Sequence, residues 1–416
     1  MRKLLTPLTF ILLLLPALLL TYCGQQEKTA TETGPEMTAA PENKPMEFVS
    51  HRVVDNAKWW WALTIGDVTN DGLQDIVYID NNANGGHLGF RTGAKDSGSW
   101  VETIVATEPP TGGTFAAGDL EVGDMDGDGD TDILAVKHTG EWDDAGAPAE
   151  IFYYENPTWE PHAIGEAKDA VKDLSIGDFD GDGLADLAVL TFDESNLRIH
   201  HQQADGTFRL VQDITQQGLH EGMDVGDLNG DGKLDIVANG FVFLNPGDDL
   251  TGNWTMETID PKWNTQTGDW SANGTKTFVA DVDGTPTIFM SHSERAGFPL
   301  ASYVRNGEGQ YTETVIMEEI PAAHTLQVFD MDLDGDLDIV TGINFARAVN
   351  LDPKVDHYEV LVLLNDGDGN WKRKVIDTEG IYNGRVADFE GDGDYDLFRY
   401  PNHEAKELYF VENQVR

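Results

Sequence analysis

The sequence has few basic residues and almost no cysteine. Its 416 residues include 27 Lys and Arg against 74 Asp and Glu, giving a formal net charge of −47, and there is a single Cys. Binding to nucleic acid relies on clustered Lys and Arg that pair with phosphates, so this balance excludes a nucleic-acid-binding protein. One Cys excludes an internal disulfide. Apolar residues are not scarce, since 40% of the chain is hydrophobic and 9% aromatic, which predicts a folded protein with a sizeable core.

The one long apolar run stands at the start of the chain. It extends from Leu4 to Leu20 and is followed by Cys23. A membrane-spanning helix needs about 20 apolar residues, whereas this run is shorter and contains Pro16, so we interpret residues 1–23 as a secretion signal, with a transmembrane anchor as the alternative. The segment resembles a bacterial lipoprotein signal, although Tyr22 stands where such signals have a small residue. This resemblance implies lipidation of Cys23 and a place in the cell envelope, periplasmic or on the outer membrane, with the lipid as the only membrane contact.

Two further segments follow the signal. Residues 24–45 are rich in Thr, Glu, Ala and Pro without periodicity, which predicts a flexible linker. We expect residues 46–416 to form one domain, because a repeat runs through all of it.

The most specific feature of the repeat is a loop rich in Asp, which we call the Asp loop. An intact Asp loop has oxygen-bearing side chains at positions 1, 3, 5 and 9 and Gly at position 6. Positions 1, 3, 5, 7 and 9 of the six intact copies are Asp67, Thr69, Asp71, Leu73 and Asp75; Asp124, Asp126, Asp128, Asp130 and Asp132; Asp178, Asp180, Asp182, Leu184 and Asp186; Asp227, Asn229, Asp231, Lys233 and Asp235; Asp330, Asp332, Asp334, Asp336 and Asp338; and Asp388, Glu390, Asp392, Asp394 and Asp396. A copy that begins at Asp281 is truncated after Gly284, and the seven copies start 49 to 58 residues apart.

A second repeat has the same phase and indicates the fold. An aromatic residue, followed in six of the seven copies by Val or Ile five positions later, occurs at Phe48, Trp100, Trp159, Phe208, Trp254, Tyr311 and Trp371. β-rich apolar stretches follow the intact Asp loops, and Gly-rich turns such as 365–370 precede aromatics. Short strands repeated at this spacing predict an all-β, seven-bladed β-propeller. In the other repeats, the strand equivalent to residues 47–54 has a partner strand just before it in the sequence. Residues 47–54 lack this partner, and residues 407–413 can supply it, so we expect these terminal strands to pair and close the ring.

The Asp loops have the composition of calcium sites. Oxygen-only ligands, with the backbone carbonyl of position 7 added, favour calcium over zinc, copper or magnesium. An EF-hand is excluded because none of the six intact loops has Glu at position 12. One such loop alone could be a solvated turn, but six copies in phase favour metal binding. We expect calcium in six blades and none in the truncated copy.

These loops and strands resemble the FG-GAP or VCBS repeat family, and the resemblance covers about residues 46–416. It implies an integrin-α-like, seven-bladed propeller with calcium in the blade loops. We expect the domain to be monomeric. It does not imply one activity, because the family includes adhesion receptors, lectins and propellers that are attached to, or act as, carbohydrate-active enzymes.

Two sets of residues are candidates for ligand binding. Polar residues near the start of each innermost strand should line the channel, unless they are only solvated strand ends; with one Trp they are Trp61, Asp119, Lys172, Asp173, His220, Glu221, Lys276, His324, Asn383 and Arg385. Outside the repeated aromatic position, Trp59, Trp60, Trp61, Trp142, Trp263 and Trp270 lie on connections. Aromatic faces in loops can stack on sugar rings, and packing beneath long loops is the alternative.

The sequence leaves three functions open. The first is an extracytoplasmic, calcium-stabilised propeller that binds a carbohydrate or protein ligand through one face. The second is a lyase or sugar dehydratase, with His292 or His324 as base and Arg295 or Arg385 steadying a substrate carboxylate. The string from His292 to Arg295 places alternate side chains on opposite faces of a strand, so its four residues cannot all converge. The third is a scaffold for other proteins.

Overall fold

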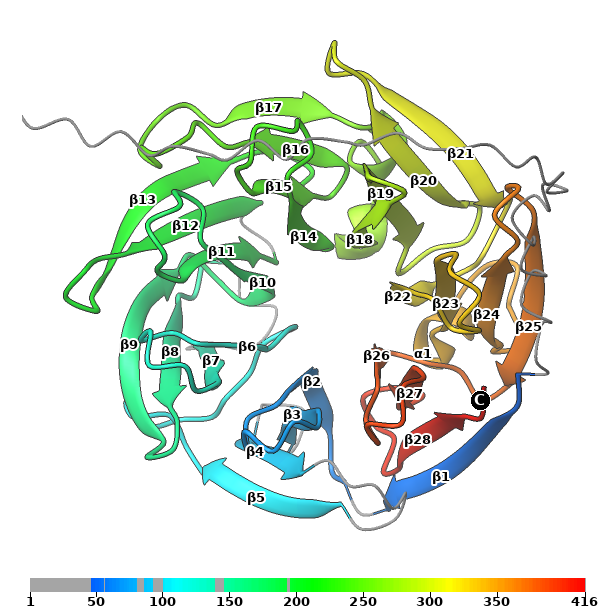
Figure 1. Ribbon diagram of the computed structural model, residues 1–416, viewed down its shortest axis with the longest axis horizontal. Helices are drawn as coiled ribbons and strands as arrows, with labels where there is room; N and C mark the ends of the chain where they lie inside the picture. Colours follow the sequence, from blue (N-terminus) through cyan, green and yellow to red (C-terminus); the bar gives the residue numbers. More distant parts are fainter. Residues whose placement is uncertain are drawn as a thin grey trace, which may run out of the picture. The chain divides into compact units, whose positions relative to one another are not determined.

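The computed structural model describes residues 46–55, 57–80, 86–92, 100–138, 146–192 and 195–415. The predicted signal, the linker and Cys23 lie outside this part of the chain. The described residues form seven four-stranded sheets around a central channel, which confirms the predicted all-β, seven-bladed propeller (Figure 1). The described connections contain the 3-10 helices η1 (Pro261–Trp263) and η2 (Trp270–Asn273) and the short helix α1 (Phe345–Ala348). Within the described ranges, no helix is long and apolar enough to cross a membrane.

Blades one to six are each built from four consecutive strands that run from the channel outwards (Figure 1). The strands are β2 (Trp60–Gly66), β3 (Asp75–Asp80), β4 (His87–Thr92) and β5 (Val101–Ala106); β6 (Glu121–Gly123), β7 (Asp132–His138), β8 (Ala149–Glu155) and β9 (Glu160–Ala167); β10 (Val171–Gly177), β11 (Asp186–Thr191), β12 (Asn196–Gln202) and β13 (Phe208–Thr215); β14 (Met223–Gly226), β15 (Asp235–Ala238), β16 (Phe241–Leu244) and β17 (Thr255–Thr258); β18 (Thr275–Val282), β19 (Thr285–His292), β20 (Leu300–Arg305) and β21 (Tyr311–Met317); and β22 (Ala323–Phe329), β23 (Asp338–Ile343), β24 (Val360–Asn365) and β25 (Trp371–Asp377).

The seventh blade joins the two ends of the domain. It consists of β26 (Arg385–Ala387), β27 (Asp396–Arg399), β28 (Leu408–Asn413) and, outermost, β1 (Phe48–Val54). β1 pairs antiparallel with β28, from Phe48 opposite Asn413 to Val54 opposite Leu408, and the two strands lie side by side in Figure 1. The predicted closure of the ring by its terminal strands is confirmed.

The core lies between neighbouring blades. Second strands such as β11 are buried along their whole length, whereas outer strands such as β13 are partly exposed, because a second strand is covered by blades on both faces. Trp60 and Trp100 of the first blade pack in one cluster with Phe398 and Phe410 of the seventh blade. Apolar burial therefore seals the junction that β1 and β28 close with hydrogen bonds.

Each Asp loop joins the first strand of its blade to the second. The Asp at position 1 accepts the backbone N–H of the Gly at position 6, as in Asp124 Oδ2 to Gly129 N at 3.0 Å. Gly129 has φ of 96°, a conformation that Gly adopts without strain. In the fifth blade, Asp283 and Gly284, both with positive φ, form a two-residue turn between the paired Val282 and Thr285. This turn replaces the eight residues that separate the two strands in the intact copies.

A buried amide at the end of the third strand ties each of four blades to the blade before it. The Asn156 side chain donates to the Val68 carbonyl at 2.8 Å, and that of Asn245 donates to the Phe179 carbonyl at 2.8 Å. Gln202 reaches the Met125 carbonyl in the same way, and Asn413 Nδ2 lies 2.8 Å from the Met331 carbonyl. Each acceptor belongs to position 2 of the preceding Asp loop, so these amides fasten the loops of neighbouring blades together.

Replacing the last of these amides should destabilise the ring. Asn413→Ala removes the donor to the buried Met331 carbonyl and to the Tyr395 carbonyl at 3.2 Å, and unmet acceptors of this kind cost about 2–3 kcal/mol in total. Urea denaturation should show this loss, whereas the exposed Asn253→Ala should change the free energy of unfolding by under about 0.5 kcal/mol. Equal effects of the two substitutions would contradict the role given to the buried amides.

Candidate functional site

The fold separates two kinds of polar residue onto opposite faces of the propeller. Every blade is built in the same order from the channel outwards, so the turns between first and second strands share one face. The Asp loops lie on this face. The first residues of the innermost strands, and the turns between second and third strands, gather at the other face, which we call the pocket face.

On the first face, carboxylates converge within single Asp loops. Oxygens of Asp124, Asp126 and Asp132 lie within 4.8 Å of one another, and so do those of Asp330, Asp332 and Asp338 in the sixth blade, and of the first three Asp in the third-blade loop. The Asp at position 9 is fully buried in each of the six intact loops. Such a set can hold a divalent cation through oxygen atoms alone.

The electrostatics of these loops also fit a cation. Burial raises the pKa of Asp235 to about 6, that of Asp338 to about 7 and that of Asp396 to about 8, and neighbouring carboxylates act in the same direction. A carboxylate whose ionised form is this costly gains from a bound positive charge. The donors and their burial therefore suit a divalent cation that prefers oxygen ligands, such as calcium, with the side-chain oxygens of positions 1, 3, 5 and 9 as ligands.

On the pocket face, an ion network surrounds Glu221, which has no exposed surface. The Nζ atom of Lys276 lies 2.8 Å from Glu221 Oε1, and that of Lys172 lies 3.3 Å from Oε2. Burial alone would raise the pKa of Glu221, but the two ammonium groups hold it well below its usual range. Three blades contribute to this network, since Lys172 lies on β10, Lys276 on β18, and Glu221 just before β14.

His324 connects this network to a second carboxylate. Its Nε2 lies 3.3 Å from Glu221 Oε1 and 3.4 Å from Glu294 Oε1, and its Nδ1 donates to the Tyr382 carbonyl at 3.1 Å. Glu294 in turn lies 2.5 Å from Arg347 Nε. The buried charges are thus paired across blades three to six, and Lys172, Glu294 and Arg347 of this network also line a pocket.

The pocket has a volume of about 360 Å³ and combines aromatic with charged side chains. Its aromatic residues include Phe192, Trp270 and Tyr382, and its charged residues include Lys172, Glu294 and Arg347. The Arg347 guanidinium lies 4.4 Å from the centre of the Trp270 ring, and Trp270 is 44% exposed. Aromatic faces beside a few fixed polar groups are typical of small-ligand sites.

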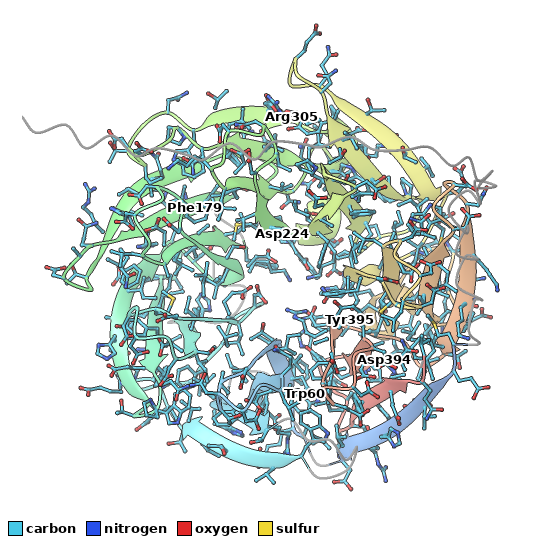
Figure 2. All side chains as sticks on the ribbon, in the orientation of Figure 1. Trp60, Phe179, Asp224, Arg305, Asp394 and Tyr395 are labelled. Atoms are coloured by element: carbon cyan, nitrogen blue, oxygen red, sulfur yellow. The ribbon has the colours of Figure 1, made fainter. Side chains whose placement is uncertain are left out.

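A smaller cavity of about 240 Å³ lies in the channel. Asp224 on β14 stands beside the central opening (Figure 2), and burial raises its pKa to about 6. Asp119 lies 3.3 Å from the Arg385 guanidinium, and burial raises the pKa of Asp173 to about 7. The channel is therefore acidic, in contrast to the mixed charges of the pocket.

The structure divides the predicted ring of ligand-binding residues between these two spaces. Lys172 lines the pocket, and His220 lies behind it, with its ring 4.7 Å from the Phe192 ring and 6.3 Å from that of Trp270. The residues that line the channel instead are Asp119, Asp173, Lys276, His324, Asn383 and Arg385. Predicted site residues from distant parts of the sequence are thus brought together, but at two levels of the molecule.

The connection tryptophans have different surroundings. Trp60 is 1% exposed and belongs to the core, and Trp263 is fully buried and donates to the Tyr303 hydroxyl at 2.9 Å, so neither ring is available to a ligand. Trp59 is half-buried and stacks on His403, which lines the pocket. The Trp61 side chain and Trp142 lie outside the described residues. Trp270 is the tryptophan that the described structure places in the pocket.

The candidates for catalysis in the fifth blade, His292 and Arg295, do not line the pocket. His292 is fully buried; its Nε2 contacts the Ala272 carbonyl, and its Nδ1 accepts the backbone N–H groups of Glu294 and Arg295. Burial lowers the pKa of His292 to about 4, and both ring nitrogens are hydrogen-bonded to the local backbone. Arg295 contacts Asp269 and Ser271. This placement does not favour His292 as a base or Arg295 as its partner.

Several pocket residues could not be selected from the sequence pattern. Phe192 follows β11, Arg347 belongs to α1 between β23 and β24, and Tyr382 precedes β26. The available signal was the length of the β23–β24 connection, residues 344–359, which far exceeds a hairpin turn. Such connections interrupt the repeat and carry much of the pocket wall.

Comparisons with known proteins agree with this architecture. The family model described as FG-GAP-like repeat matches residues 67–135, 124–189 and 178–238, and no curated protein matches the chain. Among solved structures, a lectin from Agrocybe aegerita, described as specifically recognising non-reducing terminal N-acetylglucosamine, has 19% identity and a TM-score of 0.53 over 88% of this chain and 94% of its own. Saccharomyces cerevisiae Sqt1 has 8% identity and a TM-score of 0.51 over 88% and 98%. BBS1N, solved in complex with ARL6DN, has 9% identity and a TM-score of 0.51 over 88% and 96%. These likenesses show the fold alone.

Proposed function

Because this chain is a seven-bladed propeller of FG-GAP-like repeats, we propose that calcium ions in its Asp loops stabilise the ring and that its pocket face binds a glycan. The proposal of glycan binding rests on the pocket formed by Phe192, Trp270 and Tyr382. Sugars present apolar C–H faces that stack on aromatic rings and hydroxyl groups that bond to charged side chains. Lys172 and Arg347 also offer positive charge to an acidic sugar. A lectin is among the structures with a similar fold, and a glycan is therefore the first ligand to test.

The remaining parts of the proposal concern the chain outside the described structure. The resemblance of residues 1–23 to a lipoprotein signal supports secretion and lipidation at Cys23, with the monomeric propeller tethered by residues 24–45 to the cell envelope. Extracellular or periplasmic calcium would then be the source of the bound ions.

A binding function fits the pocket better than a lyase does. His324 could be a base only if it reached the substrate, but it is 1% exposed and lies between two carboxylates. The base of a lyase must come within hydrogen-bond reach of the sugar proton that it removes.

Glycan binding should depend on the aromatic and cationic groups of the pocket. Titration of the calcium-loaded protein against neutral and acidic oligosaccharides should identify a ligand that Trp270→Ala and Arg347→Ala each weaken by about 10- to 100-fold, equal to about 1.4–2.8 kcal/mol. Arg373→Ala, on the outer strand β25 and half-exposed, is the matched control and should bind like wild type.

The same titration separates the alternatives. If an unsaturated product is detected by its ultraviolet absorbance and is lost in His324→Ala, the protein is a lyase and not only a binding protein. If a glycan binds equally well to both pocket variants, its site lies outside this pocket. If no glycan binds, a protein ligand is favoured.

A further inference from the structure

The third Asp loop differs from the other five intact loops because an imidazole faces it. Leu187 on β11 pairs with His200 on β12, so the next residue, His201, lies opposite Asp186, the position 9 residue of the loop. His201 Nδ1 is 2.9 Å from Asp186 Oδ1, and its Nε2 is 3.6 Å from Asp180 Oδ2. One ligand atom from each of these three residues lies within 4.8 Å of the other two.

The same strand pairing identifies the equivalent residue in each intact blade. It is Thr92, Glu155, Leu244, Leu364 and Glu412 in blades one, two, four, six and seven. Among the six intact blades, the third is therefore the one that has a nitrogen ligand at this position. Leu occupies it in two blades, so the fold accepts an apolar residue there.

The hydrogen bonding of His201 leaves one ring nitrogen facing a carboxylate. A carboxylate only accepts, so Nδ1 donates to Asp186, and Nε2 is the ring nitrogen left to face Asp180. Nε2 lies 3.6 Å from Asp180 Oδ2, which is longer than a hydrogen bond. Two ligands bound to one ion at about 2.1 Å lie roughly 3.0–3.6 Å apart, which matches the separation observed.

We propose that the third Asp loop is a mixed carboxylate–imidazole site for a divalent transition ion such as Mn²⁺ or Zn²⁺, with His201 Nε2 and the Asp180 carboxylate as ligands. Asp186 orients the imidazole through Nδ1, as outer carboxylates commonly do for metal-bound His. Imidazole nitrogen favours transition ions over calcium, which prefers oxygen. This inference rests on the proposed metal-binding role of the Asp loops and makes one of them chemically different from the rest.

Pulsed electron paramagnetic resonance of Mn²⁺ bound to the full chain tests the nitrogen ligand directly. Wild type should show a ¹⁴N coupling at one Mn²⁺ site. His201→Leu should remove that coupling and weaken this site at least about 10-fold, while Leu364→His, which copies the arrangement into the sixth blade beside Asp332 and Asp338, should add a second coupled site. Unchanged melting of His201→Leu in excess calcium shows that the variant folds.

The outcomes distinguish this inference from the proposal on which it rests. Calcium binding by the other loops without any ¹⁴N coupling, or Mn²⁺ affinity that His201→Leu leaves unchanged, would reduce His201 to an ion-pair partner of Asp180 and Asp186 and overturn the inference alone. Absence of binding of any divalent ion by any loop would overturn both.

Discussion

Removal of calcium is expected to lower the melting temperature of this protein by roughly 10–20 °C. The six intact Asp loops bring buried carboxylates together, as Asp338 with Asp330 and Asp332 shows. At millimolar calcium and a dissociation constant of about 10⁻⁵ to 10⁻⁴ M, each site adds about 1.4–2.7 kcal/mol. Six such sites sum to roughly 8–16 kcal/mol, and the entropy of unfolding of a domain of this size converts that sum into the expected shift. Calorimetry with and without a strong chelator measures it.

Two matched substitutions assign the effect to the loops. Asp338→Asn removes charge at position 9 of an intact loop and should lower the melting temperature in calcium but have a much smaller effect in chelator. Asp283→Asn changes the two-residue turn of the fifth blade, where Asn also adopts the positive φ of 53°, and should leave the calcium dependence intact. A melting temperature that chelation does not move would contradict calcium binding by the loops.

Removal of strand β1 is expected to abolish the closed, monomeric fold. A chain that starts at residue 55 loses the antiparallel pairing of Phe48–Val54 with β28 and the burial of Met46 and Val54. The lost hydrogen bonds and apolar contacts are worth roughly 5–10 kcal/mol, which is comparable to the whole stability of many domains. The exposed edge of β28 would also be free to pair with another chain. Light scattering and urea denaturation should therefore show self-association and loss of the cooperative transition.

The control for this truncation is a chain that starts at residue 46, which retains β1 and should melt like the full protein. Addition of a peptide of residues 46–54 to the shorter chain should restore part of the transition. If the chain that starts at residue 55 remains monomeric and equally stable, β1 does not close the ring.

The fold could be predicted because its repeat consists of residue types that particular turns and core positions require. Every blade needs a turn between its first two strands and an aromatic residue in its core, so Asp124 and Trp159 recur in phase with their counterparts. Even the paired ends were predicted to within one residue, as β1 begins at Phe48 and β28 at Leu408. The amides that fasten neighbouring blades also recur, at Asn156 and Asn413 among others. An Asn at a strand end is typical of a turn, so its role could not be predicted before its partner in the neighbouring blade was known.

The pocket could be predicted only in part, because it is built by segments that do not repeat. Positions near the starts of innermost strands converge by symmetry, which is why Lys172 and Lys276, both paired with Glu221, could be predicted to come together. The sequence could not separate Trp60 from Trp270, since both lie outside the repeated aromatic position. Strand geometry turns Trp60 into the core, while the η2 turn leaves Trp270 partly exposed beside Arg347.

We propose that one face of the ring holds calcium and that the opposite face binds a glycan. A crystal structure of the calcium-loaded protein, grown with the best oligosaccharide from the panel, tests both halves in one measurement. We expect an ion in each of the six intact Asp loops and a sugar ring against Trp270 and Phe192, within reach of Lys172 and Arg347. Loops without ions, or a sugar bound anywhere other than this pocket, would contradict it.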